Sequence, residues 1–187
     1  MIGIDDEEFI RGEVPMTKQE IRILTIAKAR INKGDVVIDI GAGTGSLSIE
    51  AAMIARQVFA IERNSEAVDL IQQNSEKFHL DNIIVINAEA PNGLEAISKV
   101  DVVLIGGSGG KLTKILETVD KRLKSGGRIV LNCITIQTIA ETLNYFKSHD
   151  NYKYEAIQVQ INRFNQVANL DMAKALNPIY IVTAVKV

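Results

Sequence analysis

The residues Gly41, Ala42, Gly43, Thr44 and Gly45 form a glycine-rich turn directly after a short apolar run. Glycine lets a backbone turn sharply and approach a ligand with no Cβ in between. In open α/β sheets, ligands bind at the carboxyl ends of the strands, which is where a turn from strand to helix lies. This turn is therefore predicted to lie against a bound ligand.

A carboxylate, Glu62, stands 21 residues after Gly41, at the end of the next predicted strand. At this spacing a carboxylate accepts hydrogen bonds from both hydroxyls of a ribose. A dinucleotide fingerprint would have its third glycine at position 46, which is Ser46, and the chain has no G-x-x-x-x-G-K-[ST] segment. The pattern therefore favours S-adenosylmethionine over NAD or a nucleoside triphosphate.

The third predicted strand is followed by Glu89 and Ala90. Methyltransferases that use S-adenosylmethionine hold the adenine at this place, with backbone amides and a polar side chain. We expect Glu89 and Ala90 to contact the cofactor there. Glu89 equally fits a charge at a helix start, where the helix dipole favours carboxylates.

Strand and helix patterns alternate along the chain. The apolar periodicity predicts strands at 35–40, 57–62, 83–86, 101–105 and 127–132. Helices are predicted at 47–55, 65–79, 94–98, 112–123 and 137–149, after a first helix that a capping box, Thr17 to Glu20, would begin. This order predicts an α/β fold of the Rossmann-like, class I methyltransferase type, with a mostly parallel twisted sheet. Extended runs at 154–162 and 179–187 are expected to form an antiparallel pair at one edge.

Composition places limits on the class of protein. The chain has 187 residues, 47% hydrophobic and 24% charged, which fits a single globular domain over 1–187. Its net charge of −2 gives no general attraction to nucleic acid or anionic membrane. A single cysteine, with no signal peptide or membrane span in the sequence, predicts a cytoplasmic protein.

Three segments together resemble one family, the cobalamin-pathway C15-methyltransferases that decarboxylate precorrin-6B or cobalt-precorrin-6B. These segments are Phe9-Ile10-Arg11-Gly12, Val14-Pro15-Met16-Thr17-Lys18 and Ile105-Gly106-Gly107-Ser108-Gly109-Gly110. The resemblance implies methyl transfer from S-adenosylmethionine to C15 of cobalt-precorrin-6B. The ring C acetate leaves as CO2, and the product is cobalt-precorrin-7. It also implies a homotetramer and cofactor contacts at Thr17, Gly41 through Gly45, Glu62 and Ala90. The absence of a fused second methyltransferase domain favours the anaerobic, cobalt-containing substrate over the metal-free one.

A tetrapyrrole that carries several carboxylates calls for cationic groups around its site. The candidate substrate-binding residues are Arg11, Lys18, Arg22, Lys111 and Arg163, joined by Gly107 and Ser108 of the glycine-rich loop after the fourth strand. Taken singly, each charge more often lies on a solvated surface. The sequence identifies no catalytic residue and no cluster of metal ligands, since the methyl donor is itself a strong electrophile.

Two segments outside the alternating pattern have predicted roles. Residues 1–18 are expected to form a lid over the cofactor and substrate, followed by a Rossmann-like core at 19–187. The connection 163–177 carries apolar residues and is expected to contribute to an oligomer interface. A methyltransferase acting on RNA or protein is the main alternative, and a nucleotide-binding domain without catalysis is another. An N/D-P-P-Y motif after the fourth strand is missing, and Asn177-Pro178-Ile179-Tyr180 opens the last strand instead.

Overall fold

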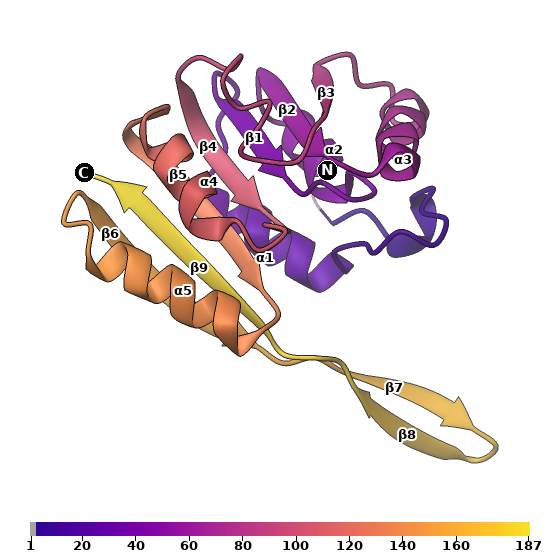
Figure 1. Cartoon of the computed structure of the whole chain (residues 1–187). Helices are drawn as coiled ribbons and strands as arrows, with labels where there is room; N and C mark the ends of the chain where they lie inside the picture. Colours follow the sequence, from indigo (N-terminus) through magenta and orange to yellow (C-terminus); the bar gives the residue numbers. More distant parts are fainter. Residues whose placement is uncertain (1–2) are drawn as a thin grey trace.

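A seven-stranded sheet forms the centre of the molecule (Figure 1). The structure is a computed structural model and describes residues 3–187. Its strand order is β3-β2-β1-β4-β5-β9-β6. The strands are β1 (Val36–Ile40), β2 (Gln57–Glu62), β3 (Ile83–Asn87), β4 (Val100–Ile105), β5 (Leu123–Cys133), β6 (Tyr152–Val159) and β9 (Ile179–Lys186). The strands β3, β2, β1, β4 and β5 pair in parallel, and β9 is antiparallel to both β5 and β6. This confirms the predicted mostly parallel sheet with an antiparallel edge.

Helices cover both faces of the sheet, so its central strands are apolar on both sides. One face packs against α1 (Gln19–Ala29), α2 (Ser46–Ala52) and α3 (Ser65–Lys77). The other packs against α4 (Leu112–Asp120) and α5 (Ile136–Lys147). Strand β1 shows the alternation, since Val37 joins the core on the α1 side, whereas Ile38 and Ile40 join the core on the α4 and α5 side. The carboxyl ends of five parallel strands are thereby held in fixed register.

The predicted helix at 94–98 does not form, and the segment is a series of turns. Gly93 precedes it with a left-handed φ of +86°, which interrupts helical geometry. The carbonyl of Leu94 accepts the Ile97 amide at 3.1 Å, which closes a single turn, and also accepts the Arg122 guanidinium at 2.7 Å. Leu94 and Ile97 are both buried, so the apolar spacing reflects one buried turn.

The predicted capping box at the start of α1 is also wrong. The helix begins at Gln19, its N-cap residue is Lys18, and no side chain caps it. The backbone carbonyl of Thr17 instead accepts a hydrogen bond from the Arg22 guanidinium at 2.7 Å. The amides at the start of α1 thus have no side-chain cap, and Arg22 instead fixes the backbone that precedes the helix.

The connection between β6 and β9 is a hairpin that the sequence reading missed. Strands β7 (Asn162–Val167) and β8 (Leu170–Ala175) pair with each other in a separate two-stranded sheet. Figure 1 shows that this hairpin extends away from the rest of the molecule. Every residue of both strands is exposed, although Phe164 and Leu170 are large apolar residues that are 72% and 71% exposed.

Candidate active site

A cavity of about 580 Å³ opens over the carboxyl ends of the parallel strands. One side is lined by the ends of β1 and β2, together with the turn after β3. The other is lined by the loop after β4, the end of β5 and the base of the hairpin. Val14 through Lys18 form a further wall, which we call the N-terminal wall. This is the place where open α/β sheets bind their ligands.

The glycine turn after β1 brings three of its five residues, Gly41, Ala42 and Gly43, to the cavity. The backbone amides of Gly41 and Ala42 both donate to the Ile61 carbonyl, at 2.9 and 3.2 Å, which fixes the turn against β2. Gly41 has a φ of +68°, and a Cβ on it would lie 2.6 Å from the Gly107 carbonyl oxygen. The two glycine-rich loops thus touch backbone to backbone, and this contact explains the glycine at position 41.

Thr44 and Gly45, which were also predicted to contact the cofactor, do not line the cavity. Thr44 is buried, and its carbonyl accepts a hydrogen bond from the Asn74 side chain at 3.0 Å. Gly45 has a φ of +79° at the N-cap of α2, and a Cβ there would lie 3.0 Å from the Ile71 side chain on α3. Helix packing therefore accounts for the glycine at position 45.

The Glu62 carboxylate lies half-buried at the end of β2 and lines the cavity. One carboxylate oxygen accepts the Gly43 amide at 2.9 Å, and the other accepts the amides of Arg63 and Asn64 at 2.8 and 2.9 Å. Glu62 therefore joins the glycine turn to the start of α3. Three backbone amides thereby occupy three of the roughly four acceptor positions of this carboxylate.

An ion cluster stands at the edge of the cavity. Glu89 lines the cavity, and its carboxylate pairs with Lys111 at 2.5 Å and with Arg63 at 3.0 Å. Hydrogen bonds from Lys111 and then from Arg63 hold the pKa of Glu89 below its usual value. Lys111, a predicted substrate-binding residue, does not itself line the cavity but faces Glu89. Ala90, the neighbour of Glu89, is buried and lines the cavity as well.

Below the glycine turn, Asp39 is fully buried on β1. Burial raises its pKa to about 6, against the effect of a 2.6 Å hydrogen bond from the Ser48 hydroxyl. Burial also raises the pKa of the Cys133 thiol at the end of β5, so this cysteine lacks the thiolate character of a nucleophile. Within residues 3–187, the structure shows no group of three acidic, histidine or cysteine side chains that could hold a metal ion.

Comparison with known proteins decides the family. The model of the precorrin methyltransferase domain matches residues 8–186. The chain belongs to the precorrin methyltransferase family. A Sulfurisphaera tokodaii protein named a probable cobalt-precorrin-6B C(15)-methyltransferase (decarboxylating) is 43% identical, over 96% of this chain and 95% of that protein. The Salmonella typhimurium cobalt-precorrin-6B C(15)-methyltransferase (decarboxylating) is 36% identical over 97% and 95% of the two chains. The crystal structure of a Geobacter metallireducens precorrin-6y C5,15-methyltransferase has a TM-score of 0.92 at 41% identity and covers 99% of this chain and 97% of that one. Family and fold together imply S-adenosylmethionine as the methyl donor of this methyltransferase.

The substrate candidates of this precorrin methyltransferase divide into two groups. Lys18, Gly107 and Ser108 line the cavity. Arg11 is exposed and outside the lining, and Arg163 at the base of the hairpin pairs with Glu20 of α1 at 2.8 Å. Neither of these two cations forms part of the cavity wall.

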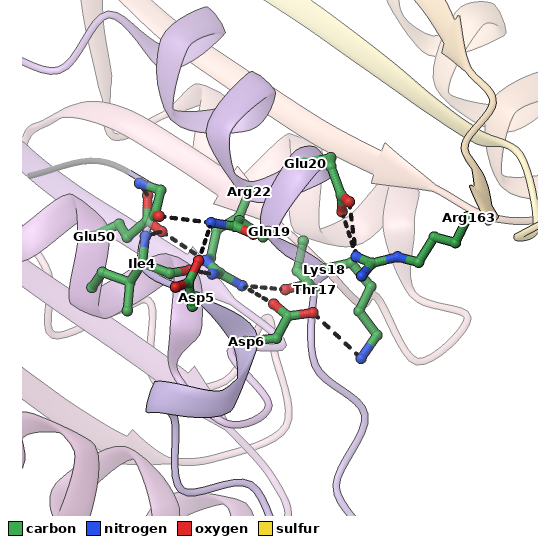
Figure 2. Close-up of polar contacts among 11 residues, drawn as sticks. Ile4, Asp5, Asp6, Thr17, Lys18, Gln19, Glu20, Arg22, Glu50 and Arg163 are labelled. Atoms are coloured by element: carbon green, nitrogen blue, oxygen red, sulfur yellow. Dashed lines mark hydrogen bonds and ion pairs between the residues drawn. The ribbon is translucent and has the colours of Figure 1, made fainter. Parts of the chain in front are cut away.

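The prediction that Arg22 binds the substrate is wrong, because the side chain of this α1 residue is fully buried. Figure 2 shows that it points toward Asp6, Thr17 and Glu50, and its exposure of 0% leaves no surface for a substrate carboxylate to contact. The pattern of charges along α1 gave no sign of this burial. Helical spacing was the available signal, since Arg22 shares one face of α1 with Thr25, Ile26 and Ala29, at three, four and seven residues further on.

Several cavity residues of this methyltransferase were missed in the sequence. Arg63 and Asn64 directly follow Glu62, so their place at a strand end was a usable signal. Ile134 and Leu176 also line the cavity but carry no recognisable motif. Their location depends on how the β5 end and the hairpin base meet, which sequence spacing does not show.

Within the described part of the chain, no helix is long and apolar enough to cross a membrane.

Proposed function

We propose that this protein transfers a methyl group from S-adenosylmethionine to C15 of cobalt-precorrin-6B and removes the ring C acetate carboxyl as CO2. The product is cobalt-precorrin-7, in the anaerobic route to cobalamin in the cytoplasm. The observation that carries the proposal is near full-length similarity, at 43% identity, to a relative named for this reaction. The cavity supports it, because the glycine turn, Glu62 and the loop at Gly107 meet around one space.

The described residues fit the methyl donor. Gly43 lines the cavity at a φ of +56°, and a Cβ there would be strained and would lie 3.0 Å from the Pro15 carbonyl oxygen of the N-terminal wall. Glu62 would hold the ribose, while Glu89 and Ala90 would border the adenine. Thr17 would bound the same space from the N-terminal wall. When bound, the sulfonium cofactor supplies an electrophilic methyl group.

The remainder of the cavity suits a large, flat, partly apolar acceptor. Ile134, Ile161 and Leu176 give it an apolar border, and Lys18 brings a cation to meet a carboxylate. The loop with Gly107 and Ser108 presents little side-chain bulk on that side. These residues orient the acceptor carbon toward the donor and exclude water, which is the main requirement of methyl transfer.

Bonds and protons balance between donor and acceptor. C15 bonds to the methyl carbon as the methyl–sulfur bond of the donor breaks with its electron pair left on sulfur, and the methylated acceptor loses one proton. The C–C bond of the acetate carboxyl breaks to release CO2. The electron pair of that bond passes into the conjugated macrocycle, which takes up one proton. The chain needs no redox partner for this sequence.

Mass spectrometry of the product tests the proposal. Purified protein, incubated with S-adenosylmethionine and cobalt-precorrin-6B, is expected to yield a product with one added CH2 and one lost CO2. A product with the added CH2 alone would show methylation without decarboxylation and contradict the second half of the proposal. Methylation of total RNA or protein extract, with none of the tetrapyrrole, would favour the alternative class of substrate.

We further propose that the hairpin forms the interface of a homotetramer. Strands β7 and β8 have no cover in the single chain, and they expose Phe164, Val167, Leu170 and Met172. Two strands with exposed apolar side chains are only marginally stable alone, so packing against further copies would stabilise them. The Arg163–Glu20 ion pair at 2.8 Å sets the base of the hairpin against α1.

A further inference from the structure

The Arg22 guanidinium is the centre of a buried polar cluster (Figure 2). Its Nε donates to the Glu50 carboxylate at 2.7 Å, and one terminal nitrogen donates to Asp6 at 3.0 Å and to the Thr17 carbonyl at 2.7 Å. The other terminal nitrogen donates to the Ile4 carbonyl. The guanidinium also lies over the Phe9 ring, 4.6 Å from its centroid. One side chain thus contacts the N-terminal segment at several separate points.

The partners of Arg22 belong to parts of the chain that bound the cavity. Thr17 is in the N-terminal wall, and Arg22 binds its backbone, so the contact holds the wall whatever side chain stands there. Glu50 lies on α2, the helix that begins directly after the glycine turn. The Glu50 carboxylate also accepts the amides of Gly3 and Ile4, at 3.1 and 3.2 Å. Arg22 therefore connects the wall on one side to the helix that follows the glycine turn on the other.

The wall and the turn are in contact where they meet. A Cβ on Gly43 would lie 3.0 Å from the Pro15 carbonyl oxygen, so little free space separates the two backbones. A second buried group, Asn74, exchanges two hydrogen bonds with Ile10 at 2.8 Å each and donates to the Thr44 carbonyl at 3.0 Å. Asn74 holds the earlier part of the segment, whereas Arg22 holds the residues that line the cavity.

The charges of the cluster are balanced only when a residue of the cavity is included. Arg22 carries one positive charge against the carboxylates of Asp6 and Glu50. The second oxygen of Asp6 faces the Lys18 ammonium at 3.6 Å, and Lys18 lines the cavity. The same cluster thereby fixes the backbone of the wall and places one of its cations.

We propose that Arg22 is a positioning residue that sets the separation between the N-terminal wall and the glycine turn, and so the shape of the cofactor site. It touches neither cofactor nor substrate, and acts through the Thr17 carbonyl and the Glu50 carboxylate. The proposal rests on the proposed binding of S-adenosylmethionine in this cavity. Losing the guanidinium should loosen the wall and weaken cofactor binding. The entropic cost of ordering the wall, which Arg22 meets before the cofactor arrives, would then be subtracted from the binding free energy.

Binding of S-adenosylhomocysteine, measured by calorimetry, tests the proposal without the tetrapyrrole. We expect Arg22→Ala to bind it about ten- to hundredfold more weakly, the range for loss of hydrogen bonds to a charged group. Millimolar guanidinium should restore part of the affinity by entering the vacated space, and urea at the same concentration should not. Trypsin should cleave the variant after Arg11 or Lys18 faster than the parent. Lys28→Ala, which removes a surface ion pair from the same helix, is the matched control and should leave binding unchanged.

Different outcomes distinguish failure of the positioning role of Arg22 from failure of the proposed methyltransferase function. A folded Arg22→Ala protein with parental affinity and parental resistance to trypsin would overturn it. If Arg22→Ala does not fold, Arg22→Lys keeps the charge but lacks the fork that reaches Thr17 and Glu50 together. Arg22→Lys should fold and bind about tenfold more weakly, and parental affinity in it would overturn the proposal as well. Failure of the parent protein to bind S-adenosylhomocysteine would instead contradict the proposed function.

Discussion

Substitution of Gly41 by alanine tests whether the two glycine-rich loops are held together by backbone contact. A Cβ at this position would lie 2.6 Å from the Gly107 oxygen and 2.8 Å from both its Cα and its nitrogen. Ordinary contact begins at 3.4 Å, and backbone atoms cannot rotate away as a side chain can. The loops must therefore separate, which disturbs two walls of the cavity at once.

The size of the effect follows from two contributions. A left-handed φ costs an alanine about 1 kcal/mol relative to glycine. Forcing a carbon into closely packed backbone costs about 1–3 kcal/mol more. Gly41→Ala should thus lower the free energy of unfolding by about 3 kcal/mol. Gly110→Ala is a matched control, because Gly110 has a φ of +77° but nothing within 4 Å of its would-be Cβ. It should lose only about 1 kcal/mol.

Urea unfolding followed by circular dichroism measures both variants, and calorimetry measures S-adenosylhomocysteine binding. Gly41→Ala should also bind the ligand more weakly, since the separated loops both line the cavity. Gly110→Ala should bind normally, because Gly110 is not part of the lining. Equal losses of stability in the two variants, with equal affinities, would refute the reasoning from close backbone contact.

Three further predictions concern other parts of the molecule. Glu62→Ala should weaken binding of S-adenosylmethionine by about 1.5–3 kcal/mol, measured by calorimetry, and an unchanged dissociation constant would remove Glu62 from the site. Burial raises the pKa of Asp39 to about 6, so the folded protein holds this proton more tightly than the unfolded chain and loses stability as the pH rises from about 4 to 6. Asp39→Asn should abolish that loss, up to about 3 kcal/mol, in urea unfolding at pH 7.5, with no gain at pH 4. Phe164→Asp with Leu170→Asp should convert the assembly to smaller species in light scattering, and an unchanged mass would exclude the hairpin as the interface.

Much of the fold could be predicted because each parallel strand is marked in the sequence by a short run rich in apolar residues. Strand β2 begins and ends where the apolar run does, and both termini of α3 lie within two residues of expectation. The helix predicted at 94–98 does not form, whereas the hairpin was not predicted, and the two errors have opposite reasons. Leu94 and Ile97 are apolar because one turn is buried, and the hairpin strands are exposed on all sides, so neither shows the periodicity that its structure requires.

The site could be predicted where function depends on local backbone geometry. The turn at Gly41 and the strand end at Glu62 both follow from short sequence patterns, and the structure places both at the cavity. Arg22 was misread because its environment is made by residues distant in sequence, Asp6 and Glu50. A charge on a helix does not show by its own position whether it faces solvent or a buried carboxylate.

The place of β9 in the sheet has a consequence for synthesis of the chain. Strand β9 is translated after β6, yet it lies between β5 and β6 and pairs with both. On the ribosome, β5 therefore has an open edge while α5, β6 and the hairpin emerge, and β6 has no neighbour until β9 follows. Open edges can pair with other chains. The parallel strands can assemble in order as they appear, but closure of the sheet must wait for the strand translated last among the seven.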